Sequence, residues 1–97
     1  MRTRKTYVVV SYDIPDDKRR TKVCRLLKNY GAHVQYSVFE CLLEPKALQE
    51  LRGRLKKLIS LRQDNVRFYF LCQDDVARIE SVGVGGWAVT DQVYYLH

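Results

Sequence analysis

The sequence predicts an α+β domain whose elements follow the order strand, helix, strand, strand, helix, strand. Three segments rich in β-branched and aromatic residues, residues 5–12, 33–43 and 66–72, are typical of strands. Between them lie two stretches in which apolar residues recur at the spacing of one helical face. At 97 residues, the chain is long enough for one such domain and too short for two.

The first strand, residues 5–12, precedes a helix that we expect over residues 17–30. Ile14-Pro15 ends the strand, because proline restricts the residue before it to extended conformations. Asp16 is then well suited to be the N-cap. The apolar residues on one face of this helix are Val23, Leu26, Leu27 and Tyr30.

The middle of the chain predicts two strands and the second helix. Residues 33–43 exceed the usual strand length of about five or six residues, so we expect a bend near Ser37 that divides them. Pro45 opens a helix that extends to about Ser60, and residues 66–72 form the last strand. This order of elements is that of the ferredoxin-like fold.

Two helices cover only one face of such a sheet. We expect Val9, Phe39 and Phe68 on the other face, where they would form a large exposed apolar patch. Because such patches usually mark interfaces, the sequence predicts a homodimer whose sheets face each other.

The chain is expected to divide into a ferredoxin-like domain, residues 1–82, and a tail, residues 83–97. Residues 78–82 and 92–96 resemble short extra strands, and we expect the tail to dock on a sheet edge of its own or of the partner subunit. Three widely spaced cysteines favour neither disulfides nor a zinc site and are predicted to be buried: Cys24, Cys41 and Cys72. With no spanning segment or signal peptide, a cytoplasmic protein is expected.

The charge of the chain favours a polyanionic partner. Seventeen lysines and arginines against 11 acids give a formal net charge of +6, and residues 18–28 of the first helix hold six cations and no acid. A solvated surface is the alternative, but clustered bases of this kind favour contacts with phosphate backbones over reading of bases. The predicted nucleic-acid-binding residues are Tyr12, Lys18, Arg19, Arg20, Arg25, Ser37 and Phe39.

Asp13 is the candidate metal ligand. It closes an apolar strand, where a carboxylate is costly unless it is paired, so it is either a turn residue or the ligand of a cation. One carboxylate is too little for Mg²⁺ without water or substrate phosphates. In a two-fold dimer, two copies of Asp13 near the axis would share one cation.

Four motifs occur in the order found in a known family: Tyr12-Asp13-Ile14, the helix start DDKRR at residues 16–20, VQYSVFE at 34–40, and VRFY at 66–69. In these the chain resembles the small CRISPR-associated "Cas two" family of spacer acquisition. The resemblance implies a ferredoxin-like homodimer with Asp13 at the metal position. It also implies endonuclease activity on RNA or DNA that depends on Mg²⁺, with Mn²⁺ as an alternative, and Asp13 as the catalytic residue.

The resemblance implies a second role, in which the dimer bridges two dimers of the CRISPR integrase and binds duplex DNA while spacers are inserted. Two alternatives to the nuclease therefore remain at this point. One is a non-catalytic nucleic-acid-binding scaffold of the integrase complex, and the other is a toxin-type ribonuclease on the same fold.

Overall fold

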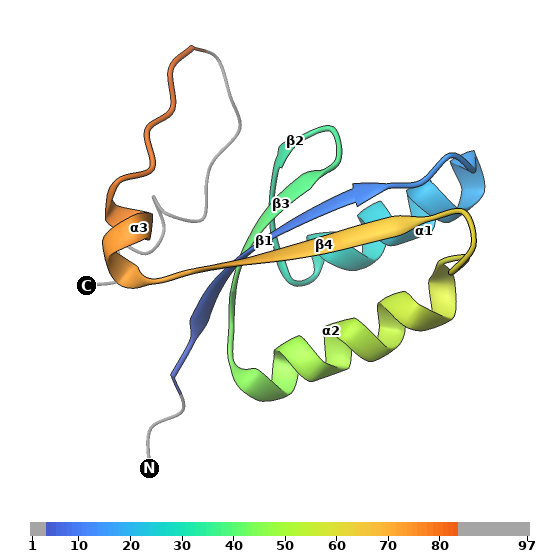
Figure 1. Cartoon of the computed structure of the whole chain (residues 1–97), viewed down its shortest axis with the longest axis horizontal. Coiled ribbons are helices and arrows are strands. Elements are labelled where there is room, and N and C mark those ends of the chain that lie inside the picture. Colours follow the sequence, from blue (N-terminus) through green and yellow to red (C-terminus); the bar gives the residue numbers. More distant parts are fainter. Residues whose placement is uncertain (1–3, 84–97) are drawn as a thin grey trace.

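The computed structural model describes residues 4–83, which form one sheet with helices (Figure 1). The predicted order of strands and helices is confirmed, and the chain bends after Gln35 into two strands as expected. No helix within residues 4–83 is long and apolar enough to cross a membrane. The elements are β1 Thr6–Asp13, α1 Asp17–Lys28, β2 Gly31–Gln35, β3 Val38–Leu43, α2 Pro45–Leu58, β4 Asn65–Leu71 and α3 Gln73–Ala77.

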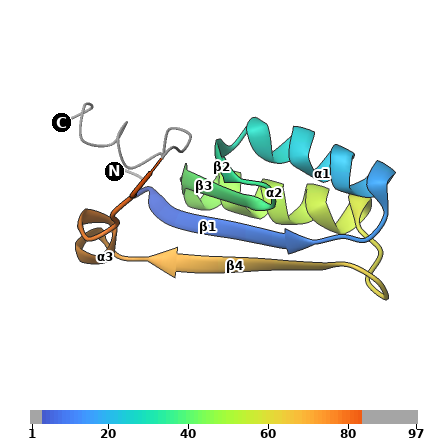
Figure 2. The same ribbon diagram turned by 90° about the horizontal axis from the view of Figure 1, so that it is seen from above.

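The four strands form an antiparallel sheet in the order β2-β3-β1-β4, which is the ferredoxin-like order. α1 and α2 lie together on one side of this sheet (Figure 2). β1 is central and pairs with β3 and with β4, so that Asp13 stands opposite Asn65 at the end of the ladder. The central position of β1 therefore fixes where its last residue, Asp13, is placed.

Alternation along β1 decides what each face of the sheet presents. Val8, Val10 and Tyr12 belong to the core under the helices, so Val9 and Asp13 belong to the opposite, open face. The expectation that Phe39 and Phe68 lie on the open face is wrong. Phe39 is fully buried in the helix-side core and Phe68 packs against it, because their registers place them opposite Val10.

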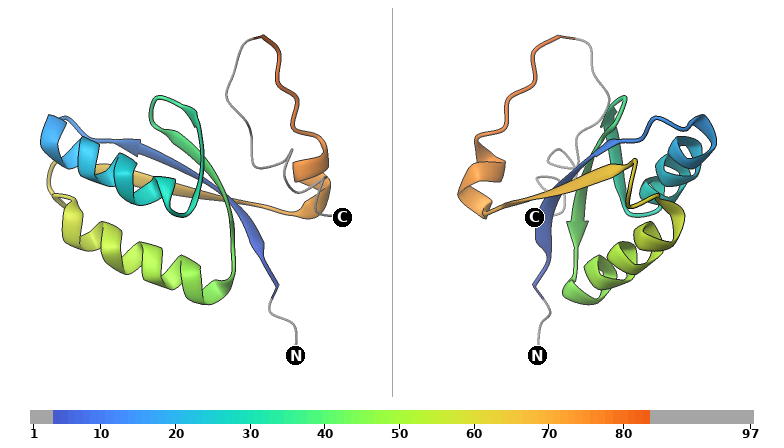
Figure 3. Two further views of the ribbon diagram at one scale, coloured as in Figure 1. Left: turned by 180° about the vertical axis from the view of Figure 1, so that it is seen from behind. Right: turned by 45° about the vertical axis from the view of Figure 1, so that its right-hand side comes forward.

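The third helix, α3, was not predicted, and the predicted strand over residues 78–82, which follow it, is wrong. Asp75 caps its start by accepting from the backbone N–H of Cys72 at 3.3 Å, and Val76 packs on Tyr7 of the open face. The chain beyond Arg78 has no regular structure as far as Gly83. Figure 3 shows α3 beyond the end of β4, away from α1 and α2. The predicted strand at 92–96 and the docking of the tail lie outside the described residues.

The three cysteines differ in exposure. Cys41 is buried as predicted, Cys24 is half-buried, and Cys72 is exposed, so the prediction of a buried residue is wrong for Cys72. Its position at the start of α3, rather than within a strand, accounts for that exposure. None of the three forms a disulfide.

Candidate nucleic-acid and metal-binding site

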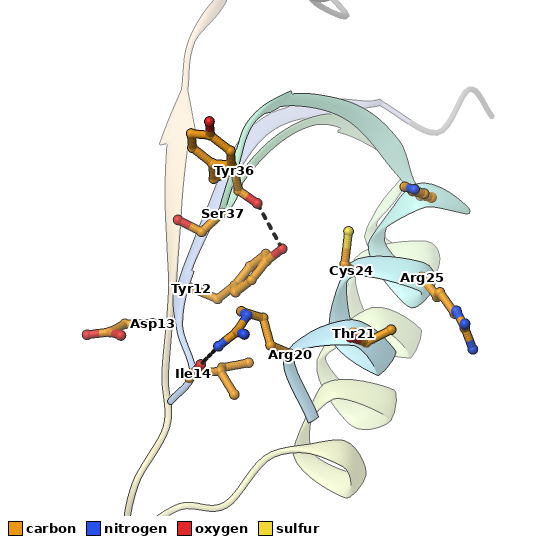
Figure 4. Close-up of a pocket in the computed structure, with 10 residues that line it drawn as sticks. Tyr12, Asp13, Ile14, Arg20, Thr21, Cys24, Arg25, Tyr36 and Ser37 are labelled. Carbon is orange, nitrogen blue, oxygen red and sulfur yellow. Dashed lines mark hydrogen bonds between the residues drawn. The ribbon is translucent and has the colours of Figure 1, made fainter. Parts of the chain in front are cut away.

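Asp13 is the last residue of β1 and its side chain is exposed. Figure 4 shows its carboxylate on the side of β1 opposite α1, as strand alternation after the inward-facing Tyr12 requires. Apart from α3 at its far end, nothing described covers this face. Asp13 is thus presented on the surface through which the sequence predicts a second subunit to pack.

A divalent cation at Asp13 would need further ligands besides this carboxylate. Within residues 4–83, no three His, Cys, Asp or Glu side chains lie close enough together to hold a metal ion. Mg²⁺ is usually held by one or two carboxylates, with waters and substrate phosphates completing an octahedron. Asp13 therefore fits such a site as one ligand of several, with the others supplied by a second copy or by substrate.

Arg19 was predicted to contact phosphate, but its guanidinium group is hydrogen-bonded to another residue of the domain. Its Nε and Nη2 donate to the two carboxylate oxygens of Asp64 at 2.8 and 3.1 Å, and the Asp64 side chain is fully buried. Asp64 also accepts from the backbone N–H of Ser60 at 2.8 Å. The bond from Arg19 holds the pKa of the Asp64 carboxyl below its usual range. This bidentate pair ties the start of α1 to the loop before β4, which makes Arg19 a structural residue.

We expect Asp64→Asn to lower the thermal unfolding midpoint at pH 7 and to have little effect at pH 2. Because the folded-state pKa of Asp64 is depressed, its contribution to stability is present above the unfolded pKa of about 4 and is lost as pH falls through the folded value. Circular-dichroism melts at several pH values measure this. Glu44→Gln, an exposed carboxyl at the start of α2, is the control. A difference between wild type and Asp64→Asn that stays constant from pH 7 to pH 2 would contradict the assignment.

Several predicted residues come together in an open depression of about 540 Å³ between α1 and the β2–β3 turn (Figure 4). Its lining includes four residues predicted to bind nucleic acid, the predicted metal ligand Asp13, and five residues outside the predicted site: Ile14, Thr21, Cys24, Lys28 and Tyr36. Lys18 is exposed on α1 but does not line the depression. The predicted site residues in the lining are the candidate metal ligand Asp13 and the predicted nucleic-acid contacts Tyr12, Arg20, Arg25 and Ser37.

Tyr12 forms part of the inner wall of this depression. Its side chain is 5% exposed, and its hydroxyl donates to the carbonyl oxygen of Tyr36 at 3.2 Å. Burial, together with the neighbouring Cys24, raises the pKa of Tyr12 to about 12. Tyr12 is therefore a neutral hydrogen-bond donor near neutral pH, and it is not a base.

Phe39 does not fit its predicted role as a nucleic-acid contact. Its ring is fully buried and stacks on His33, with ring centroids 4.5 Å apart and planes at 4°. A ring without exposed surface cannot stack on a base unless the core opens. Buried and half-buried residues alternate along β3, and Phe39 is one of the buried ones, so its ring faces the core and not the open face where it was expected.

These features define a class of small ferredoxin-like domain that carries an exposed aspartate at the end of its central first strand and a basic first helix beside it. Within that class, residues 6–79 match the family model for the CRISPR associated protein Cas2. The chain belongs to the Cas2 family.

Three similar proteins match this chain over most of its length, in sequence or in structure. A Chloroflexus aurantiacus protein named CRISPR-associated endoribonuclease Cas2 3 is 44% identical over 92 residues, which is 95% of this chain and 98% of the relative. The crystal structure of Streptococcus pyogenes Cas2 superposes with a TM-score of 0.72 at 35% identity, over 79% of this chain and 99% of that one. A chain in a partial Cas6-RT-Cas1–Cas2 complex gives a TM-score of 0.72 at 31% identity, over 79% and 90% of the two chains.

Proposed function

We propose that this protein is a divalent-cation-dependent endonuclease that hydrolyses phosphodiester bonds of RNA or DNA as a homodimer. One observation carries the proposal: the Asp13 carboxylate is exposed on the sheet face that α1 and α2 leave uncovered. On that face, two copies related by a two-fold axis bring two carboxylates together. The name of the Chloroflexus relative, an endoribonuclease, supports the reaction class.

In this mechanism Asp13 of each copy would be a ligand of Mg²⁺, or Mn²⁺, with phosphate oxygens of the substrate as further ligands. A cation bound there would supply an activated water and would neutralise charge at the phosphate. Arg20, on the first turns of α1, donates to the carbonyl of Ile14 at 2.9 Å. It thereby holds the turn after Asp13 in place.

The purified protein should cleave RNA or DNA in the presence of Mg²⁺ or Mn²⁺ and lose this cleavage when EDTA is added. Activity should return when Mg²⁺ is restored in excess, because the carboxylates remain in place without the ion. Gel analysis of end-labelled substrates measures it. Cleavage that persists in EDTA would refute a role for the cation.

A second candidate function is a nucleic-acid-binding scaffold in a spacer-acquisition complex with CRISPR integrase dimers. The likeness to a chain of a Cas1–Cas2 complex favours it, as does the exposed basic surface of α1. In this function Asp13 does no chemistry and duplex DNA is held by its phosphates. The two candidates share the basic surface and differ in their need for the carboxylate.

Duplex binding should depend steeply on salt for either candidate. Affinity should fall by about 10³- to 10⁵-fold between about 50 and 200 mM salt if about six to ten phosphates are neutralised per dimer. Lys18→Gln, on the exposed side of α1, should reduce the salt slope by about 0.9 for each phosphate that is no longer neutralised, with the same effect on every sequence. Arg78→Gln, at the end of α3, is the matched control. Fluorescence anisotropy measures both slopes, and a flat salt response would refute phosphate binding.

A further inference from the structure

Asn65 is the residue directly opposite Asp13 in the sheet. The ladder between β1 and β4 pairs these two residues at its end, and it pairs Tyr12 with Val66 beside them. Tyr12 belongs to the core under the helices and Val66 packs against that core, so Asp13 and Asn65 lie together on the open face. Side chains directly opposite each other have Cβ atoms about 4.5 to 5.5 Å apart. Both residues are exposed, so one ion at this edge of the sheet is within reach of both side chains.

Neither of these two side chains has a polar partner among the described residues. The Asp13 carboxylate makes no hydrogen bond or ion pair within residues 4–83, and the side-chain amide of Asn65 makes none there either. An asparagine beside a turn commonly bonds its side chain to nearby backbone, and Asn65 does not. The cation further along the same face of β4, Arg67, donates to the Tyr69 hydroxyl at 3.4 Å and not to Asp13. The side-chain oxygens of Asp13 and Asn65 are therefore free to bind an ion from solution.

Two consecutive arginines of α1 hold the backbone next to these two residues. Arg20 donates to the carbonyl of the residue after Asp13 at 2.9 Å. Arg19 binds the fully buried carboxylate of the residue before Asn65, at 2.8 and 3.1 Å. Ligands whose surroundings already fix them lose less conformational freedom when they bind. Both strands are thus held in place at this edge before a cation arrives.

We propose that Asn65 is a further ligand of the divalent cation at Asp13, through the oxygen of its side-chain amide. Carboxylate and carbonyl oxygens are the donors that suit Mg²⁺ and Mn²⁺. The inference rests on the proposed function, because it adds a residue to the same metal site. Two copies of the chain would supply both side chains twice, which would leave positions of the octahedron for water and substrate phosphate.

The test measures Mn²⁺ binding to the purified protein without nucleic acid, from the electron paramagnetic resonance signal of free Mn²⁺, so that it does not depend on cleavage. Asn65→Ala removes an oxygen donor without changing the charge. It should weaken Mn²⁺ binding by at least about tenfold, the least that even outer-shell partners of metal ligands contribute. Asn65→Asp keeps oxygen donors and should bind Mn²⁺ at least as tightly as the wild type. Asn29→Ala, at the exposed end of α1, is the matched control and should bind as the wild type does.

Two results would overturn the assignment of Asn65. One is an Mn²⁺ affinity of Asn65→Ala equal to that of the wild type. The other is a loss of affinity in Asn65→Asp as large as in Asn65→Ala, which would show that the substitutions disturb this edge of the sheet and do not remove a ligand. In either case, weaker binding by Asp13→Asn would leave the metal site and the proposed function standing. Absence of Mn²⁺ binding by the wild type would refute both.

Discussion

Replacing Asp13 by asparagine is expected to reduce metal-dependent cleavage by at least about a hundredfold, since even outer-shell partners of metal ligands cost up to that much. Asparagine keeps the shape of the side chain and removes the charge that holds the cation. Affinity for a blunt duplex should stay level or rise slightly, because a negative charge near the phosphates is lost. Initial rates of cleavage with Mg²⁺ and with Mn²⁺, and anisotropy with the same substrate, measure the two quantities.

The matched control for this variant is Asp74→Asn, an exposed carboxylate in the first turn of α3. Sedimentation velocity should show that wild type and both variants are dimers, so that a loss of cleavage is not a loss of assembly. Unchanged cleavage by Asp13→Asn would place the reaction elsewhere. If neither protein cleaves between pH 6 and pH 10 while both support spacer integration, the scaffold function is correct and Asp13 is a turn residue.

Phe39→Ala is expected to lower the free energy of unfolding by about 3 to 5 kcal/mol, the usual cost of removing a buried aromatic ring. Phe39 has no exposed surface and lies against His33 on one side, with Tyr12 at a centroid distance of 6.4 Å. In a domain whose total stability is about 5 to 15 kcal/mol, such a loss removes a large fraction of the free energy of unfolding. Urea unfolding followed by circular dichroism measures it.

Phe39→Leu, which retains more of the buried volume, should cost less and should bind nucleic acid as the wild type does. Tyr36→Ala, in contrast, should leave the stability unchanged, because its ring is exposed. A Phe39→Ala variant that keeps its stability but loses binding would show that the ring contacts nucleic acid, as the sequence predicted.

Local pattern was sufficient for most of the secondary structure. β-Branched runs predicted β1 and β4 to within one or two residues, and the length of residues 33–43 predicted the bend between β2 and β3. The spacing of apolar residues predicted α1 and α2, because the period of side chains along one helical face depends only on the segment itself. α3 was not predicted from the sequence, because five residues are too few to show a helical period and because its start depends on a cap from Asp75.

The predicted site residues also differ in whether the sequence alone was enough to find them. Asp13 was predicted to be a metal ligand from the sequence alone, because a carboxylate that ends an apolar strand is costly if it is buried without a partner. Only the structure shows that its side chain is exposed, and its role as a ligand stays a prediction. The basic character of α1 was equally plain from the sequence, because charge is a matter of composition. Neither inference required knowledge of which elements pack against each other.

Only the tertiary structure shows which residues distant in the sequence contact each other. Arg19 and Asp64 are 45 residues apart, so nothing in the helix pattern distinguishes this half-buried structural arginine from its exposed neighbour Arg20. The same holds for the depression that Tyr36 and Lys28 share, whose walls come from three separate elements. Sequence periodicity tells which side chains share a face of one element, whereas packing between elements determines which face meets the core, another side chain or solvent.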